Sequence, residues 1–325
     1  DIDEDGMETK IRKMFGNIPL PTNPERRVYY PVGDNRKMIL YTATDKEQPT
    51  VNFTLYMKRD ITPKAERNTL RNYADDYKTS ILRMAVNDRL EALARAADAP
   101  FISASVRDGN FFLASTKDVF ELSGVLKEGR VLEGIRLLVG EVERARANGI
   151  TPEELRRGKA EMLSFAENGY NDRTNRRNGE FVEACVQNFL EETPILEPEY
   201  ELGLVRKLDK SVTLADINAL AKDIITNQNQ VVTLFGPAKE GFEMPANATI
   251  EKNILEAQTR KYAPYHEAKA LGDSLVTHLP KPGSILSERS YKYGYTELTL
   301  SNGMKVYVRQ TDFEPDEVNL KLFSM

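Results

Sequence analysis

The 325-residue sequence is poor in the side chains that build metal and disulfide sites, because it holds one cysteine and two histidines. The single cysteine, Cys185, excludes an internal disulfide and a zinc site made of cysteines. A zinc-binding helix carries two histidines one turn apart, but Ala270 stands one turn after His266, and His278 lies in a proline-rich stretch. We therefore do not expect an intact zinc site built from this chain alone.

Long apolar runs and an excess of positive charge are missing as well. No run approaches the roughly 20 apolar residues of a membrane-spanning helix. The net charge of −5 gives no reason to expect a nucleic acid or an anionic membrane surface as partner. The first residues have neither the basic start nor the apolar core of a signal peptide. Because the chain starts at Asp1 rather than methionine, we expect a mature or excised piece of a protein. The sequence shows no targeting signal from which a compartment could be predicted.

Common catalytic motifs are also lacking: there is no Gly-x-Ser-x-Gly elbow, no Walker loop and no Gly-x-Gly-x-x-Gly after a strand. Residues 1–6 alternate aspartates like the start of a calcium loop, but Arg12 stands where that loop needs a bidentate glutamate. We interpret 1–6 as the acidic first turn of a helix. Cys185 lies with Val182 and Phe189 on the apolar side of a predicted helix, which favours a buried, inert thiol.

What is present is a regular pattern of apolar residues that predicts an α+β domain. Alternation indicates strands at 27–32, 38–44, 51–58, 101–108, 111–127 and 230–235. Spacing near 3.6 indicates helices at 64–97, 131–148, 152–167, 181–190, 198–208 and 213–226. Gly109-Asn110 is the expected turn between two strands, and Thr151-Pro152-Glu153-Glu154 starts a helix with a capping box. Because strands come in adjacent pairs, we predict a largely antiparallel β-sheet with helices packed on one face.

The two ends of the chain read as parts of other units. Residues 1–16 predict a helix, and a proline-rich segment follows it. Residues 241–294 contain four prolines and broken helical patterns, which predict a linker. Asn302-Gly303 between two alternating runs predicts a β-hairpin, and apolar residues at 318–322 predict a third strand. Three short strands with one apolar face need another element to pack against.

A cluster of polar residues between two predicted helices is a candidate contact site. Tyr170, Arg173, Arg176 and Arg177 lie in the break "NGYNDRTNRRNG". Guanidinium groups at a helix tip suit an anion or a peptide carbonyl. A solvated turn between helices explains the same residues without any ligand, so both interpretations stay open.

Five segments together resemble the insulinase/pitrilysin-like zinc metallopeptidases. They are "FGNIPLP", "NDRLEALARAADAPFISASV", "ITPEELRRGKAEML", "SVTLADINALAKDII" and "TELTLSNGMKVYVRQTDFEPDEV", and they span nearly the whole chain. The resemblance implies four related α+β domains in two halves that close around a peptide, as in insulinase- and processing-peptidase-like proteins. It also implies a zinc ion in the first domain, held by an inverted His-x-x-Glu-His motif and a later Glu, and water activated by that metal.

This sequence contains no His-x-x-Glu-His motif, so the resemblance implies a noncatalytic second domain with no catalytic or metal-binding residue of its own. Zinc is expected in the full-length parent and not in this fragment. The implied organisation is the end of the catalytic domain and a linker at 1–24, the noncatalytic domain at 25–240, a linker between the halves at 241–294, and the first strands of a truncated following domain at 295–325.

The resemblance also implies partners: the missing catalytic domain, the second half of the parent chain and a peptide substrate. In related proteins the fourth domain contributes an Arg and a Tyr to the zinc site, and we interpret 170–177 as the counterpart of that region. Exposed strand edges also allow a dimer. Some relatives keep the fold and lose the metal site, so a scaffold subunit without peptidase activity stays open as the alternative. Bacterial relatives are often exported to the cell envelope, but the sequence itself indicates no compartment.

Overall fold

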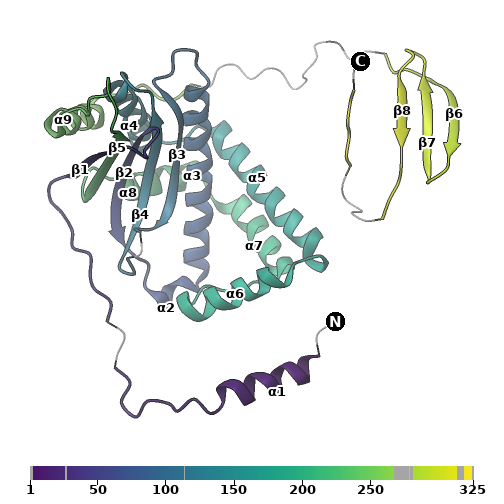
Figure 1. The fold of residues 1–325 in the computed structure, drawn as a ribbon, viewed down its shortest axis with the longest axis horizontal. Helices are drawn as coiled ribbons and strands as arrows, with labels where there is room; N and C mark the ends of the chain where they lie inside the picture. The colour runs from purple at the N-terminus through teal and green to yellow at the C-terminus, as the bar shows by residue number, and fades with distance from the viewer. Residues whose placement is uncertain are drawn as a thin grey trace. The chain divides into compact units, whose positions relative to one another are not determined.

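A computed structural model describes residues 3–25, 28–112, 114–266, 278, 281–312 and 318–323 (Figure 1). The contacts divide the chain into two compact units, Asp1–His266 and Glu267–Met325. Among the described residues, no helix is both long and apolar enough to span a membrane.

The first unit is built on a five-stranded sheet with the strand order β1-β5-β2-β4-β3. The strands are β1 Ile39–Asp45, β2 Val51–Asp60, β3 Phe101–Asn110, β4 Lys117–Leu126 and β5 Gln230–Pro237. Strands β1 and β5 pair in parallel, whereas the other three pairs are antiparallel. The predicted largely antiparallel sheet is confirmed.

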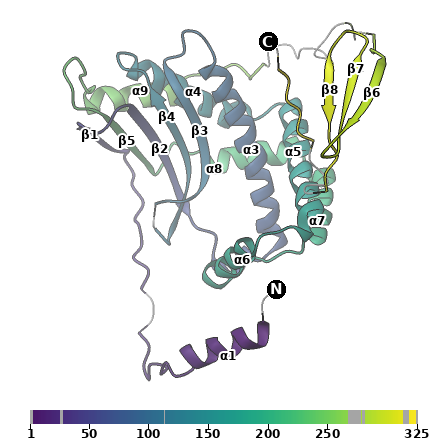
Figure 2. The same cartoon turned by 45° about the vertical axis from the view of Figure 1, so that its right-hand side comes forward.

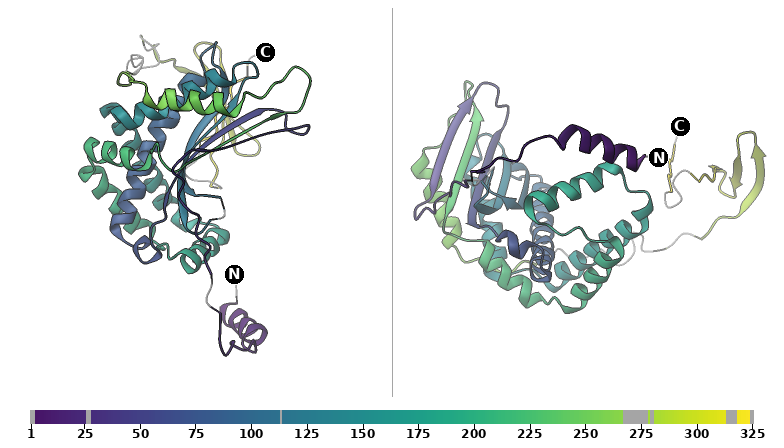
Figure 3. Two further views of the ribbon diagram at one scale, coloured as in Figure 1. Left: turned by 90° about the vertical axis from the view of Figure 1, so that its left-hand side faces the viewer. Right: turned by 90° about the horizontal axis from the view of Figure 1, so that it is seen from below.

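Helices cover one face of this sheet (Figure 3). They are α2 Lys64–Arg67, α3 Leu70–Ala94, α4 Val131–Asn148, α5 Pro152–Asn171, α6 Asn178–Glu191, α7 Pro198–Ser211, α8 Leu214–Ile224 and α9 Asn247–Thr259. α5 runs beside α3 and α7 (Figure 2). Alternate residues of β2, such as Phe53 and Leu55, pack with Ile81 and Val86 of α3, and all four are fully buried. Each buried side chain of this size contributes about 1.5–3 kcal/mol, so this layer holds the unit together.

Two predicted local features of the sheet are wrong. Gly109 and Asn110 do not form a turn, because they are the last residues of β3 and pair with β4. The predicted strand at 27–32 is also absent from its described residues, 28–32, which have no regular structure. Pro31 lacks an amide hydrogen for a sheet, and the Val32 amide donates to the Thr116 hydroxyl instead (3.1 Å).

Helix α9 lies inside the stretch that the sequence predicts as a linker. Its residues Ile250, Ile254 and Ala257 are buried and belong to the same apolar core as α4. This part of 241–294 is therefore packed structure, while residues 267–277 and 279–280 lie outside the described part of the chain.

The N-terminal helix, α1 Glu4–Phe15, begins where the acidic residues predict it. The Asp3 carboxylate accepts from the Gly6 amide (3.0 Å), which is an N-cap. The interpretation of this segment as an acidic helix start is confirmed. No residue of α1 is buried.

The second unit is a three-stranded antiparallel sheet of β6 Ile285–Tyr291, β7 Tyr295–Leu300 and β8 Lys305–Val308, in that order. The predicted hairpin is confirmed: Gly303 has φ +85°, and the Met304 amide donates to the Asn302 side chain (3.1 Å). The strand predicted at 318–322 is wrong, since residues 318–323 are not a strand. The third strand is β6, on the other side of β7.

Candidate functional site

The four candidate contact residues lie in one turn between α5 and α6. Tyr170 is in the last turn of α5, and Arg173 is in a short 3₁₀ turn, Asp172–Thr174. Arg173 donates to the Tyr170 carbonyl (2.7 Å), and its guanidinium lies 4.1 Å from the centre of the Tyr170 ring. An exposed pair of this kind contributes about 0.5–1 kcal/mol. Tyr170 and Arg173 are therefore brought together.

The other two arginines lie at the start of α6. The Arg176 guanidinium stands 4.5 Å from the centre of the Phe181 ring, and its Nε is 3.4 Å from the Glu180 carboxylate. The backbone amide of Arg177 donates to the same carboxylate (3.4 Å), and its side chain is exposed. These contacts are local, so they explain an ordered turn by themselves. A role in binding a substrate stays a prediction.

Helix α6 reverses one prediction from the sequence, because Cys185 is exposed rather than buried. The apolar residues that share its side of the helix, among them Val182 and Phe189, are exposed too (62% and 85%). The periodicity correctly groups these residues on one face. That face points away from the body of the unit.

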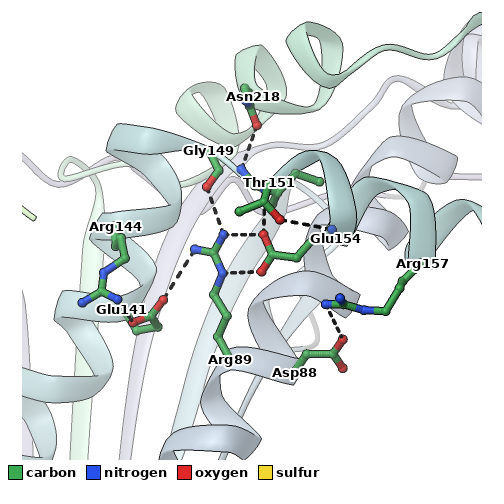
Figure 4. Close-up of polar contacts among 10 residues, drawn as sticks. Asp88, Arg89, Glu141, Arg144, Gly149, Thr151, Glu154, Arg157 and Asn218 are labelled. Atoms are coloured by element: carbon green, nitrogen blue, oxygen red, sulfur yellow. Dashed lines mark hydrogen bonds and ion pairs between the residues drawn. The ribbon is translucent and has the colours of Figure 1, made fainter. Parts of the chain in front are cut away.

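The most deeply buried charges lie elsewhere, around Arg89 of α3 (Figure 4). Its guanidinium donates to both carboxylate oxygens of Glu154 (2.6 and 2.7 Å) and to the Gly149 carbonyl (3.1 Å). The side chains of Arg89 and Glu154 are 1% and 0% exposed. Glu154 also forms the predicted capping box: it accepts from the Thr151 amide (2.7 Å), and its own amide donates to the Thr151 hydroxyl (3.1 Å). One carboxylate thus starts α5 and neutralises a cation on α3.

The electrostatics of this cluster favour the charged form of Arg89. Burial lowers the pKa of Arg89, but the hydrogen bonds and charge of Glu154 raise it more, so the net shift is upward. Burial raises the pKa of Glu141, against the attraction of Arg144 and Arg89. The ring of Tyr265 covers the Arg89 guanidinium at 4.3 Å. Because each partner is a neighbouring protein group, the cluster reads as a structural tie between α3, α4, α5 and the end of the first unit.

A second group of charges lies where α3 meets the ends of the strands. Arg59 donates to the Asp108 carboxylate (2.7 Å), and Asp118 is nearby. Desolvation, followed by the negative charges of Asp108 and Asp75, raises the pKa of Asp76 to about 6. Asp76 keeps contact with solvent and accepts from the Asn72 side chain (3.1 Å). This carboxylate is set to titrate close to neutral pH.

The sequence of this chain is similar to those of two known proteins. No protein-family model matches the sequence. The zinc protease PQQL-like protein of Arabidopsis thaliana is 27% identical over 264 residues, which are 81% of this chain and 24% of that protein. The probable zinc protease PqqL of Escherichia coli is 22% identical over 324 residues, which are 98% of this chain and 34% of that protein. The chain therefore spans about a quarter to a third of the length of these relatives.

Solved structures share the fold. The periplasmic protease PqqL from Escherichia coli superposes with a TM-score of 0.71, 20% identity and 97% of this chain covered, against 34% of that chain. The first half of the same protease superposes with a TM-score of 0.70 and 18% identity. The match covers 82% of this chain and 56% of that chain. A predicted insulinase family protease from Yersinia pestis superposes with a TM-score of 0.66 and 11% identity. The match covers 79% of this chain and 54% of that chain. The chain is therefore similar in sequence to zinc proteases and shares its fold with insulinase-like proteases.

The described residues of this chain do not fit the zinc site of such a protease. Within the part of the chain that the structure describes, no three side chains of His, Cys, Asp or Glu come close enough to hold a metal ion. His266 is exposed at the end of the first unit, and His278 is exposed twelve residues further along the sequence. We assign no step of zinc chemistry to these residues.

Two features of this chain could not be predicted from its sequence. The burial of Arg89 could not be predicted, because its partners Glu141 and Glu154 lie 52 and 65 residues away in the sequence. The only local signal was the capping box, which marks Glu154 but not its second role. The outward orientation of α6 left no signal, since periodicity does not say which way a face points.

Proposed function

We propose that this chain is the noncatalytic second domain of a zinc-dependent metallopeptidase and forms part of the wall of its peptide-binding chamber. One observation carries the proposal: the chain matches zinc proteases along most of its length, yet its sequence contains no His-x-x-Glu-His motif. The zinc and the general base then belong to another part of the parent protein. Peptide hydrolysis is a property of that whole protein.

The helices at the two ends of the first unit support the proposal that residues 1–24 are the end of a preceding domain and a linker. In α9 three apolar residues at positions i, i+4 and i+7 are buried beside α4 after the last strand. Helix α1 repeats this spacing with exposed residues (Met7 47%, Ile11 51%, Met14 71%) and is also followed by a proline-containing segment. A helix with this apolar stripe suits the end of a preceding domain of the same fold. We assign that preceding domain as the catalytic one.

The size of the first unit supports the proposed boundaries on the other side. Asp1–His266 is 266 of 325 residues, or 82% of the chain, and the alignment with the first half of PqqL also covers 82% of the chain. The packing of α9 extends the noncatalytic domain beyond 240 to the end of that helix. The strands that begin at 285 then belong to a following domain, and the link to it begins after His266.

The helix-free face of the five-stranded sheet is the surface we assign to the chamber wall (Figure 3). The strand register places Tyr41, Thr233, Thr54, Ser123 and Ser105 in one row across all five strands of this face. Hydroxyl groups in such a row offer hydrogen bonds to a polypeptide backbone. At one end of the sheet, the Tyr41 ring lies 6.0 Å from that of Phe235, and both are exposed.

Separating the parent protein into two chains tests the proposal. This chain alone should neither cleave peptides nor bind zinc stoichiometrically. A chain with the preceding residues of the parent should bind zinc, and hydrolysis should require this chain together with the remaining parts of the parent. Cleavage or tight zinc binding by this chain alone would refute the proposal. A parent without zinc or hydrolysis would instead support a scaffold subunit of the same fold.

A further inference from the structure

Helix α6 is exposed on nearly all sides, and its apolar side faces solvent. Five of its apolar residues are exposed by 42–85%: Phe181, Val182, Val186, Phe189 and Leu190. Only Ala184 and Glu191 are half-buried, and these lie seven residues apart on the other side of the helix. A surface helix in a globular protein shows the reverse arrangement.

The orientation is fixed by contacts at the C-terminal end of α6. Arg67 pairs with the Glu191 carboxylate, and Lys64 donates to the Leu190 carbonyl. The Asn188 side chain donates to the Thr193 carbonyl (2.8 Å), and Glu192 in the left-handed conformation ends the helix, with its amide donating to the Asn188 carbonyl. These polar contacts use the inner side of the helix, so the apolar side is left facing outward.

An apolar face of this kind is a place where a partner binds. A 14-residue helix is marginal in water, and tertiary packing of its apolar face normally stabilises it. Contiguous exposed apolar surface on a folded protein marks an interaction site. The described residues leave this face uncovered, so a bound partner would supply the packing that α6 lacks.

The charges around the face select the kind of partner. Helices that lie on membranes carry Lys and Arg on their polar side, but the polar side of α6 carries Glu180, Glu183 and Glu191 and no basic residue. The basic groups are confined to its N-terminal end. There the side chains of Arg173 and Arg177 have no carboxylate partner among the described residues. A carboxylate is the group that complements such guanidinium pairs.

We propose that the apolar face of α6, together with Arg173 and Arg177, binds a segment of polypeptide substrate that carries bulky apolar side chains followed by a carboxylate. This rests on the proposed function, because that function brings polypeptides to this domain. It adds the residues that contact the segment and its chemical character. Phe189 and Val182 are at the centre of the contact, and the two arginines set its polarity.

Cys185 provides a reporter, since it is the only cysteine and lies on this face. A polarity-sensitive dye is attached to Cys185, and short synthetic peptides rich in Phe and Leu are titrated into the chain. One peptide ends in two aspartates and its twin in two lysines. The acidic peptide should shift the dye emission to the blue and bind at least about tenfold more tightly than its twin. Equal binding of the two peptides, or no shift with either, would overturn the proposal.

Matched variants separate the face from the rest of the surface. Phe189→Ser should weaken binding of the acidic peptide by at least about tenfold. Gln187→Ser on the polar side of α6 and Leu255→Ser, an exposed apolar residue on α9, should leave it unchanged. Arg177→Ala should abolish the preference between the two peptides. An effect of Leu255→Ser as large as that of Phe189→Ser would overturn the assignment to α6.

Two further measurements distinguish the competing occupants. Concentration-dependent mass in solution that Phe189→Ser removes, or a dye shift with anionic vesicles, would assign the face to a second copy or a membrane and overturn the proposal. Hydrolysis by the full-length parent, with a peptide too short to reach α6, tests the proposed function separately. Its persistence in a Phe189→Ser parent that no longer binds the acidic peptide would support both ideas.

Discussion

Replacing Glu154 by alanine removes the carboxylate that neutralises the buried guanidinium of Arg89. The pair is closed off from solvent, with 1% and 0% of the two side chains exposed. After the change, Arg89 keeps the Gly149 carbonyl (3.1 Å) and a longer contact with Glu141 (3.5 Å). Neither replaces the two short bonds to Glu154.

The expected loss of stability is large because a buried charge is left without its partner. Breaking a buried ion pair by removing one member costs about 3–5 kcal/mol. Glu154→Ala also removes the capping box at Thr151, which is worth about 0.5–2 kcal/mol. These terms overlap, so we expect the free energy of unfolding to fall by about 4 kcal/mol. That is a large part of the stability of an ordinary domain.

Urea unfolding followed by far-UV circular dichroism measures this loss. Glu153→Ala is the matched control and should change the free energy of unfolding little, since its bridge to Arg156 is exposed to solvent. The double variant Arg89→Met, Glu154→Ala should be more stable than Glu154→Ala alone, because no buried cation remains. A loss below about 1 kcal/mol for Glu154→Ala, or a double variant that is less stable still, would refute the reasoning.

Gly149 ends α4 with φ at 77°, and an added Cβ would contact the Asn218 side chain, so Gly149→Ala should cost about 1–3 kcal/mol in urea unfolding; an unchanged midpoint would contradict this. In the folded chain the pKa of Asp76 is raised from 3.8 to about 6, so the folded state binds the extra proton in that range and loses stability as pH rises through it. Asp76→Asn should therefore stabilise the chain at about pH 8, by less than about 1 kcal/mol because the side chain meets solvent, and change little at about pH 4. The exposed Cys185 should react with a thiol reagent in the folded chain nearly as fast as in urea, and strong protection would contradict the outward orientation of α6.

Features that depend on neighbours in the sequence were predictable. The capping box at Thr151, the Asn302-Gly303 hairpin and the alternation along β2 all appear in the structure. In each case the side chains that fix the backbone lie within a few residues of one another. The pairing of strands also predicted the α+β class.

Features that depend on distant residues were not predictable. The segment after residue 27 resembled a strand, but its amides bond to the side chains of Thr116 and Asn229, far away in the sequence. Arg89 is buried only because carboxylates from two other helices surround it. For the candidate turn at 170–177, the sequence located the residues but gave no ligand for them.

Charged residues are usually exposed and apolar residues usually buried, but Arg89 and the apolar residues of α6 show the reverse. The two cases have opposite explanations. At Arg89 a charge is buried, and its hydrogen bonds go to groups of the same unit, so the site needs nothing further and serves stability. At α6 an apolar face is exposed, and the residues that would cover it are missing from the described chain. A buried charge whose hydrogen bonds are all made stabilises the fold, whereas an exposed apolar face costs free energy until a partner covers it. Beyond the sheet face that we assign to the chamber wall, we therefore look for a further binding surface on α6 and the turn before it rather than at the buried cluster around Arg89.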